Sequence, residues 1–109
     1  MVREIKLLDK IHLQKYMYLI TSFLSREIPP VVFQEFFVQI RREDPYWLSG
    51  LFHEEIGRVL DSLFLDVDEF NNGKSYDPND KFNIDEKELR ERVSNKLVVL
   101  NSILGESSR

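Results

Sequence analysis

The chain has 109 residues with a formal net charge of −4, and 42% of its residues are hydrophobic. This length suits one domain with a single core, and the apolar fraction excludes an intrinsically disordered chain. Because there is no cysteine, disulfides, thiol catalysis, thiolate metal sites and iron–sulfur clusters are excluded, so packing alone must hold the fold.

Apolar residues recur at helical spacing in the first 42 residues and predict two helices. The first is expected from about Ile5 to Ser25. The second follows Pro29-Pro30, since proline suits the first turn of a helix, and it ends before Asp44-Pro45. The aromatic pair after this break, Tyr46-Trp47, is interpreted as part of the core rather than as an exposed anchor.

The third helix, from about Leu51 to Phe70, has the most regular apolar pattern. The fourth opens at Asn83, which we expect to cap it in a capping box with Glu86, and it ends at Gly105, leaving residues 105–109 as a frayed tail. The residues predicted to be buried are Phe52, Ile56, Val59, Leu63, Val67, Phe33, Phe36 and Leu97.

Four amphipathic segments with short connections predict an all-α fold, a single-domain antiparallel four-helix bundle over residues 1–109. A strand over residues 97–100 is the weaker interpretation, because a capped and charged helix surrounds it. No secretory signal is visible, and no apolar run approaches the roughly 18 residues of a membrane span. We therefore expect a cytoplasmic protein that makes no contact with a membrane.

The charge is unevenly distributed along the chain. Residues 1–42 carry +3 and residues 89–109 carry +2, whereas residues 43–88, with thirteen acidic and four basic side chains, carry −9. Negative charge is least favourable at the C-terminal end of a helix, yet Asp66, Asp68 and Glu69 lie at the expected end of the third helix. This acidic segment is either simply solvated or used to bind a basic partner, and both interpretations stay open.

The acidic residues of the third helix are arranged with a seven-residue spacing. Glu54, Asp61 and Asp68 therefore lie along one side of this helix, and Leu65 interrupts the line. Because charge alone rarely gives selectivity, an apolar or aromatic centre is expected within the acidic ring, with Leu65 and Tyr76 as the candidates. The candidate binding residues, including the following loop, are Glu54, Asp61, Leu65, Asp66, Asp68, Glu69, Tyr76, Asp77 and Asp80.

Groups needed for catalysis, metal binding or nucleic-acid binding are not brought together by the sequence. A calcium-binding EF-hand loop beginning at Asp68 would place Phe70 and Asn79 at ligand positions. His12 and His53 lie on different helices, and neither a zinc-binding HExxH pattern nor a phosphate-binding glycine loop is present. The acidic middle of the chain would also repel phosphates. We expect no enzymatic activity, no cofactor, no metal and no direct contact with nucleic acid.

The order and spacing of several short patterns resemble the colicin D-type immunity proteins, a family that also occurs beside toxins of contact-dependent growth inhibition systems. The resemblance spans roughly residues 13–104. It is carried by Phe23-Leu24-Ser25-Arg26-Glu27-Ile28, Phe33, Glu35, Arg41-Arg42, Leu63-Phe64-x-x-Val67-Asp68-x-Phe70 and Ile84-Asp85-Glu86-x-Glu88-Leu89-Arg90.

The resemblance implies a four-helix bundle that neutralises a toxin domain cleaving transfer RNA, by covering its basic catalytic cleft with acidic side chains. It places Asp68 at one acidic position, and the loop through Asp77 and Asp80 in a second acidic region. The implied partner is a basic toxin nuclease domain, and the protein is expected to be a monomer. The alternative is a small helical adaptor, regulator or nucleic-acid mimic that docks another basic protein.

Overall fold

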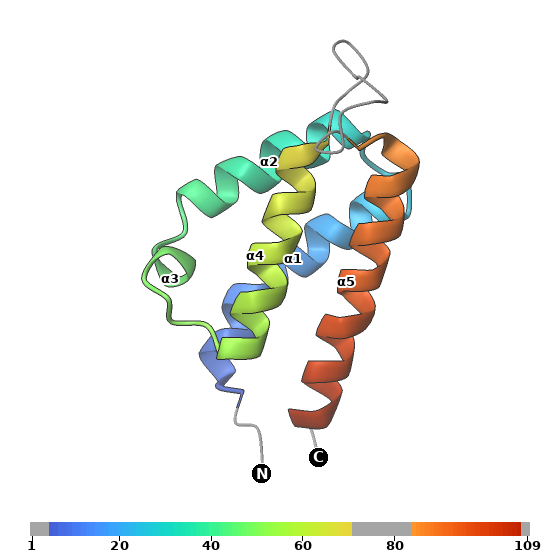
Figure 1. Ribbon diagram of the computed structural model, residues 1–109. Coiled ribbons are helices and arrows are strands. Elements are labelled where there is room, and N and C mark those ends of the chain that lie inside the picture. The colour runs from blue at the N-terminus through green and yellow to red at the C-terminus, as the bar shows by residue number, and fades with distance from the viewer. Residues whose placement is uncertain (1–4, 71–83, 108–109) are drawn as a thin grey trace.

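The computed structural model describes residues 5–70 and 84–107, and these residues form a compact unit of five helices (Figure 1). They are α1 (Leu7–Leu24), α2 (Pro30–Arg42), α3 (Pro45–Leu48), α4 (Glu54–Glu69) and α5 (Glu86–Ser107). The prediction of an all-helical fold is confirmed, with the addition of the one-turn helix α3.

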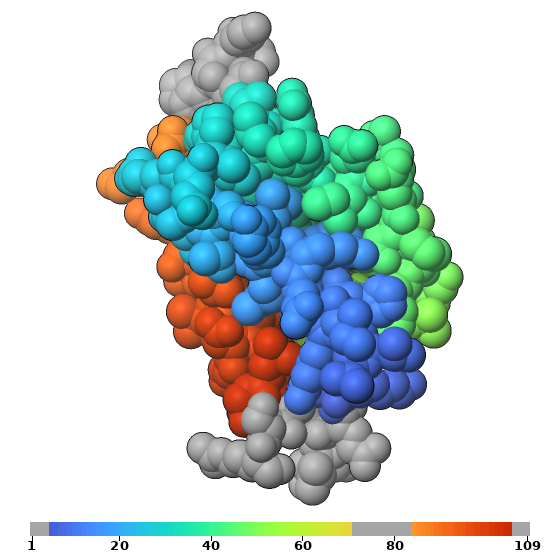
Figure 2. All heavy atoms as spheres, turned by 180° about the vertical axis from the view of Figure 1, so that it is seen from behind, coloured from blue at the N-terminus to red at the C-terminus, as the bar shows by residue number. Residues whose placement is uncertain are grey.

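The four long helices pack in a ring, each in contact with two others, rather than as a regular bundle. α5 packs on α4 and on α1, and α2 packs on α1 and on α4. Although α4 and α5 lie side by side and run in opposite directions, α2 runs obliquely across the others, so a strictly antiparallel four-helix bundle is not confirmed (Figure 1). On the opposite face, α1 covers the middle of the molecule between α5 and the α3 region (Figure 2).

Local signals explain most helix boundaries. Pro30 occupies the first turn of α2, and the imidazole of His53 caps α4 by accepting a hydrogen bond from the Glu55 N–H at 3.2 Å. The start of α5 is capped by Asp85, whose side chain accepts the Glu88 N–H at 2.9 Å. Asn83, predicted to cap α5, lies outside the described residues. The predicted end at Gly105 is wrong, because α5 continues to Ser107.

Aromatic side chains fill the centre between α1, α2 and α3. Phe23 and Phe33 stack at 4.4 Å between ring centroids, and Tyr16 meets the edge of Trp47 at 5.1 Å. Most of the predicted core residues are buried, while Val59 and Leu97 are only partly so. Phe36 is an error, because it lies on the exposed flank of α2. The wholly buried neighbours on α2 are Phe33 and Phe37, four residues apart on the stripe that faces the core.

Truncating Leu63 to Ala is expected to lower the free energy of unfolding by about 2–5 kcal/mol, because this side chain is wholly buried at the centre of α4. The matched control is Leu65→Ala, since Leu65 lies two residues away on the same helix and is 59% exposed. Urea denaturation followed by circular dichroism measures both changes. Equal midpoints for the two variants would show that the packing of α4 is misassigned.

Candidate functional site

The outer side of α4 carries the acidic line that the sequence predicts. Glu54, Asp61, Leu65 and Asp68 are all exposed, as their spacing requires. Arg58 lies in the same line and forms an ion pair with Glu54, four residues earlier. The exposed line is therefore charge-balanced at its N-terminal end and acidic only toward its C-terminal end, at Asp61 and Asp68.

Asp61 is held in place by an aromatic side chain from another helix. The indole Nε1–H of Trp47 in α3 donates a hydrogen bond to Asp61 Oδ1 at 3.1 Å. Because Trp47 is itself buried, this bond anchors an exposed carboxylate to the core. No local sequence pattern connects these two residues, which are fourteen positions apart.

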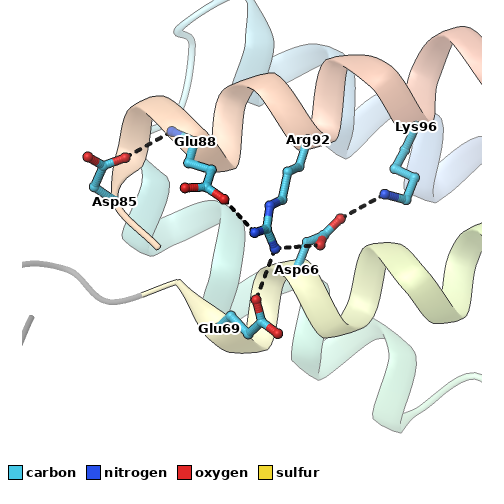
Figure 3. A network of polar contacts seen from close by, with 6 residues as sticks. All are labelled: Asp66, Glu69, Asp85, Glu88, Arg92 and Lys96. Atoms are coloured by element: carbon cyan, nitrogen blue, oxygen red, sulfur yellow. Dashed lines mark hydrogen bonds and ion pairs between the residues drawn. The ribbon is translucent and has the colours of Figure 1, made fainter. Parts of the chain in front are cut away.

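Asp66 and Glu69 are not free members of the acidic face, because cations of α5 bind them (Figure 3). Arg92 Nη1 donates to Asp66 Oδ1 at 3.1 Å and to Glu69 Oε2 at 2.9 Å, and Arg92 Nη2 bonds Glu88. Lys96 Nζ donates to Asp66 Oδ2 at 2.9 Å. Asp66 is only 8% exposed and both of its carboxylate oxygens are bonded to α5, so this predicted contact residue is turned toward α5 rather than presented on the surface.

The Arg92 network neutralises part of the negative charge of residues 43–88. Burial lowers the pKa of Arg92, but hydrogen bonds from its guanidinium to Glu88, Glu69 and Asp66 outweigh burial and raise the pKa above its ordinary value. The guanidinium therefore stays charged throughout the physiological range. Folding uses the basic residues of α5 to neutralise acids of α4, which leaves a smaller acidic surface than the sequence predicts.

Asp68 is the most available carboxylate of α4. It is exposed in the last turn of the helix, and it makes no ion pair with any residue in the described part of the chain. Because no basic side chain occurs in the last turn of α4, nothing there offsets its charge against the negative end of the helix dipole. Three further candidates, Tyr76, Asp77 and Asp80, lie outside the described residues.

The end of α4 beside Asp68 is fixed by a glutamine from α2. Gln34 Nε2 donates to the backbone carbonyls of Val67 at 2.9 Å and Phe70 at 3.0 Å. These carbonyls belong to the end of a helix, where backbone acceptors lack partners within the helix. The Ile84 N–H also donates to the Glu69 carbonyl at 3.1 Å, so the chain returns to the same place. Phe70 and Ile84 are thus held next to each other at the end of α4.

The turn that carries Trp47 is built on a buried carboxylate. The side chain of Asp44 accepts the backbone N–H groups of Tyr46 at 3.1 Å and Trp47 at 3.4 Å and so caps α3. The Tyr16 hydroxyl donates to Asp44 Oδ2 at 2.6 Å, and Lys15 Nζ lies 3.0 Å from the same oxygen. α1 and α3 are therefore joined by a bonded, charged group rather than by apolar contact alone.

A second buried pair joins the same two helices. The Tyr46 hydroxyl donates to Asp9 Oδ1 at 2.6 Å, and burial together with this bond raises the pKa of Tyr46 to about 12. Tyr46 and Trp47 are both buried, which confirms the core interpretation of this aromatic pair. Acid groups of α1 and of the α2–α3 link thus position α3.

Stability is expected to fall in acid through Asp44. Burial raises the pKa of Asp44, but hydrogen bonds from Tyr16 and Lys15 outweigh burial and bring the pKa below its ordinary value of 3.8. Its contribution is therefore complete above that value and is lost as the pH falls through the lower pKa of the folded state. Urea unfolding at a series of pH values should show a shallower acid loss for Asp44→Asn than for the wild type. Glu35→Gln, which changes an exposed carboxylate of α2, should retain the wild-type slope, and an identical slope for all three proteins would contradict the assignment.

No cluster of three or more histidine or carboxylate side chains in residues 5–70 and 84–107 has the arrangement needed to hold a metal ion. Of the five helices there, none combines the length and the apolar character that crossing a membrane requires.

A surface pocket of about 420 Å³ between α2, α3 and α4 was not predicted from the sequence. Its lining includes Arg41, Trp47, Leu48, Arg58 and Asp61. The sequence offered one signal, the break at Asp44-Pro45 followed by Ser49-Gly50, but this signal marks an irregular segment and gives no indication of a pocket. The pocket adjoins the acidic line of α4, because Asp61 belongs to both.

Comparison with known protein families gives a match over most of the chain. The sequence model of a family described as bacterial self-protective colicin-like immunity matches residues 11–100. No curated protein and no solved structure matches the chain significantly. The matched range begins in α1 and ends in α5, so it includes the whole arrangement described above.

Proposed function

Because the chain belongs to the bacterial self-protective colicin-like immunity family, we propose that it neutralises a toxin nuclease domain that cleaves transfer RNA. Membership makes the chain an immunity protein, and proteins of this kind act by binding a toxin. The nature of the toxin and the mode of binding are the proposed part. Like the colicin D-type proteins that it resembles, the chain would block its partner without catalysis, cofactor or metal.

The exposed positions of Asp61, Leu65 and Asp68 on one side of α4 carry the proposal. A cleft that holds RNA phosphates must be basic, so acidic side chains on a rigid helix can occupy it and exclude the substrate. Complementary charge would also steer the two proteins together and speed their association. Leu65, between the two acids, supplies the apolar centre that a selective interface needs.

The remaining predicted contacts divide into two groups. We propose that Asp77 and Asp80 supply further acidic contacts to the toxin and that Tyr76 supplies an aromatic one. Glu54 and Glu69 are lesser contributors, because Arg58 and Arg92 already neutralise them. Asp66 is left out for the same reason and because it is buried.

The proposed setting is the cytoplasm of a bacterium that carries the toxin gene, either for a bacteriocin or for a contact-dependent growth inhibition system. The protein would act there as a monomer against its own toxin. Co-expression of the tagged protein with the product of the gene immediately upstream tests this proposal. We expect the two to purify together and the cells to survive. Cell death without co-purification would contradict it.

A further inference from the structure

The pocket between α2, α3 and α4 contains an arginine, Arg41, whose Nε has no hydrogen-bond partner. The guanidinium carbon of Arg41 lies 4.0 Å from the centroid of the Phe64 ring and 5.0 Å from that of the Trp47 ring. Its Nε is buried and has no hydrogen-bond partner, and no carboxylate of the described residues lies within ion-pair distance. Arg41 is thus held by two aromatic rings with its charge uncompensated.

Other charged groups of this pocket do have partners. Arg58 pairs with Glu54, and Asp61 accepts the indole N–H of Trp47. The four charged residues of the lining, two arginines and two acids, sum to zero formal charge. Within the described part of the chain, Arg41 is the one of the four without a bonded partner. An arginine without an ion-pair partner can bond an incoming carboxylate through the planar fork of its guanidinium. A planar guanidinium on aromatic rings is also preorganised for a carboxylate.

The rim of the pocket is apolar on the side of α3. Leu48 is 56% exposed and lines the pocket, and Leu51 is 55% exposed beside Gly50 and Phe52, which also line it. Gly50 has φ +69°, a backbone conformation that turns the chain sharply between the two leucines. Arginine is enriched in protein-binding hot spots, and the apolar contacts around such a residue help to exclude water.

We propose that this pocket receives an acidic side chain of the protein partner, flanked by apolar residues, with its carboxylate on Arg41. The inference rests on the proposed function in taking the toxin as that partner. At the acidic face of α4, the immunity protein supplies the acidic side chains and the toxin supplies the basic ones. At the pocket the charges are reversed, because Arg41 of the immunity protein would bind an acidic side chain of the toxin. Such a reversal within one interface favours one toxin over others of similar net charge.

Trp47 makes the pocket directly observable, because it is the only tryptophan in the chain. The probe is the capped peptide acetyl-Leu-Glu-Leu-amide, titrated into the full-length protein while Trp47 fluorescence is recorded. We expect a saturable change that acetyl-Leu-Gln-Leu-amide does not reproduce. Arg41→Gln should weaken binding of the glutamate peptide by about tenfold or more. Arg42→Gln changes the neighbouring exposed arginine of α2, which does not line the pocket, and should leave binding within about twofold.

Circular dichroism first establishes that each variant is folded, and Arg41→Lys provides a second test that retains the charge without the planar fork. Binding of the glutamine peptide as strong as that of the glutamate peptide, or no effect of Arg41→Gln, would overturn the inference. So would preference for acetyl-Leu-Lys-Leu-amide, which would assign the pocket to Asp61 and Glu54 instead.

Binding of the inactivated toxin domain separates this inference from the proposed function. If the wild type binds the toxin and Arg41→Gln binds it as tightly, the pocket inference fails and the proposed function stands. If the wild type does not bind the toxin but still binds the glutamate peptide through Arg41, the pocket stands and the proposed function fails.

Discussion

Replacing Asp68 by Lys is expected to weaken binding of the toxin domain by about 2–5 kcal/mol, the cost of removing a desolvated charge from an interface. Asp68 is exposed at the end of α4 and forms no ion pair within the described residues, so its carboxylate is available to a partner. The loss should appear mainly as faster dissociation. Reversal of Asp68 together with Asp77 and Asp80 should abolish protection of cells that express the toxin.

The control for Asp68 is Glu35→Lys, which makes the same change of charge on the exposed side of α2. Surface plasmon resonance with an inactivated toxin domain measures both variants, and circular dichroism establishes that both remain folded. We expect Glu35→Lys to alter only the association rate, and only slightly. Equal losses for the two variants would mean that net charge governs binding, and the assignment of the α4 face would then be wrong.

Replacing Arg92 by Met is expected to lower the free energy of unfolding by about 2 kcal/mol, less than for a fully buried pair, because it removes the shared cation of a partly buried ionic network. Asp66 is almost wholly buried and would retain only Lys96, while Glu69 and Glu88 would lose their bonds to the guanidinium. Methionine keeps much of the length and apolar character of the arginine stem. The loss would therefore report the charge rather than the packing.

Arg58→Met provides the matched comparison for Arg92, since Arg58 and Glu54 form an exposed ion pair along one helix. Exposed pairs contribute little, so this variant should lose less than about 1 kcal/mol in the same urea titrations. If Arg92→Met proved as mild as Arg58→Met, the network between α4 and α5 would not contribute to stability. Neutralisation of the α4 acids by Arg92 would then not stabilise the fold.

Patterns within one helix were predictable from the sequence, because the helical period determines which residues share a side. The buried positions Ile56, Leu63 and Val67 and the exposed positions Asp61 and Asp68 both follow from it.

Asp66 shows where the helical pattern stops being informative. It lies three residues after Leu63, close to the buried stripe, and its partners Arg92 and Lys96 are 26 and 30 residues away. Periodicity assigns a residue to a side of its helix but does not identify the side chain that faces it from another helix.

The α3 region was the least predictable part of the candidate site. The sequence indicated a break at Asp44-Pro45, and it suggested that Tyr46 and Trp47 belong to the core. The bonds that build the turn, from Tyr16 to Asp44 and from Trp47 to Asp61, join residues separated by 28 and 14 positions. No local pattern encodes such pairs, so the pocket that they border was not predictable either.

Cleavage of transfer RNA by the cognate toxin domain, measured while the purified protein is titrated in, tests toxin neutralisation most directly. We expect cleavage to fall in proportion to added protein and to end at one equivalent, because a tightly bound protein in the cleft excludes the substrate. Added salt should slow the onset of inhibition, since steering by opposite charges weakens as ionic strength rises. Full cleavage in the presence of excess folded protein would contradict the proposed function.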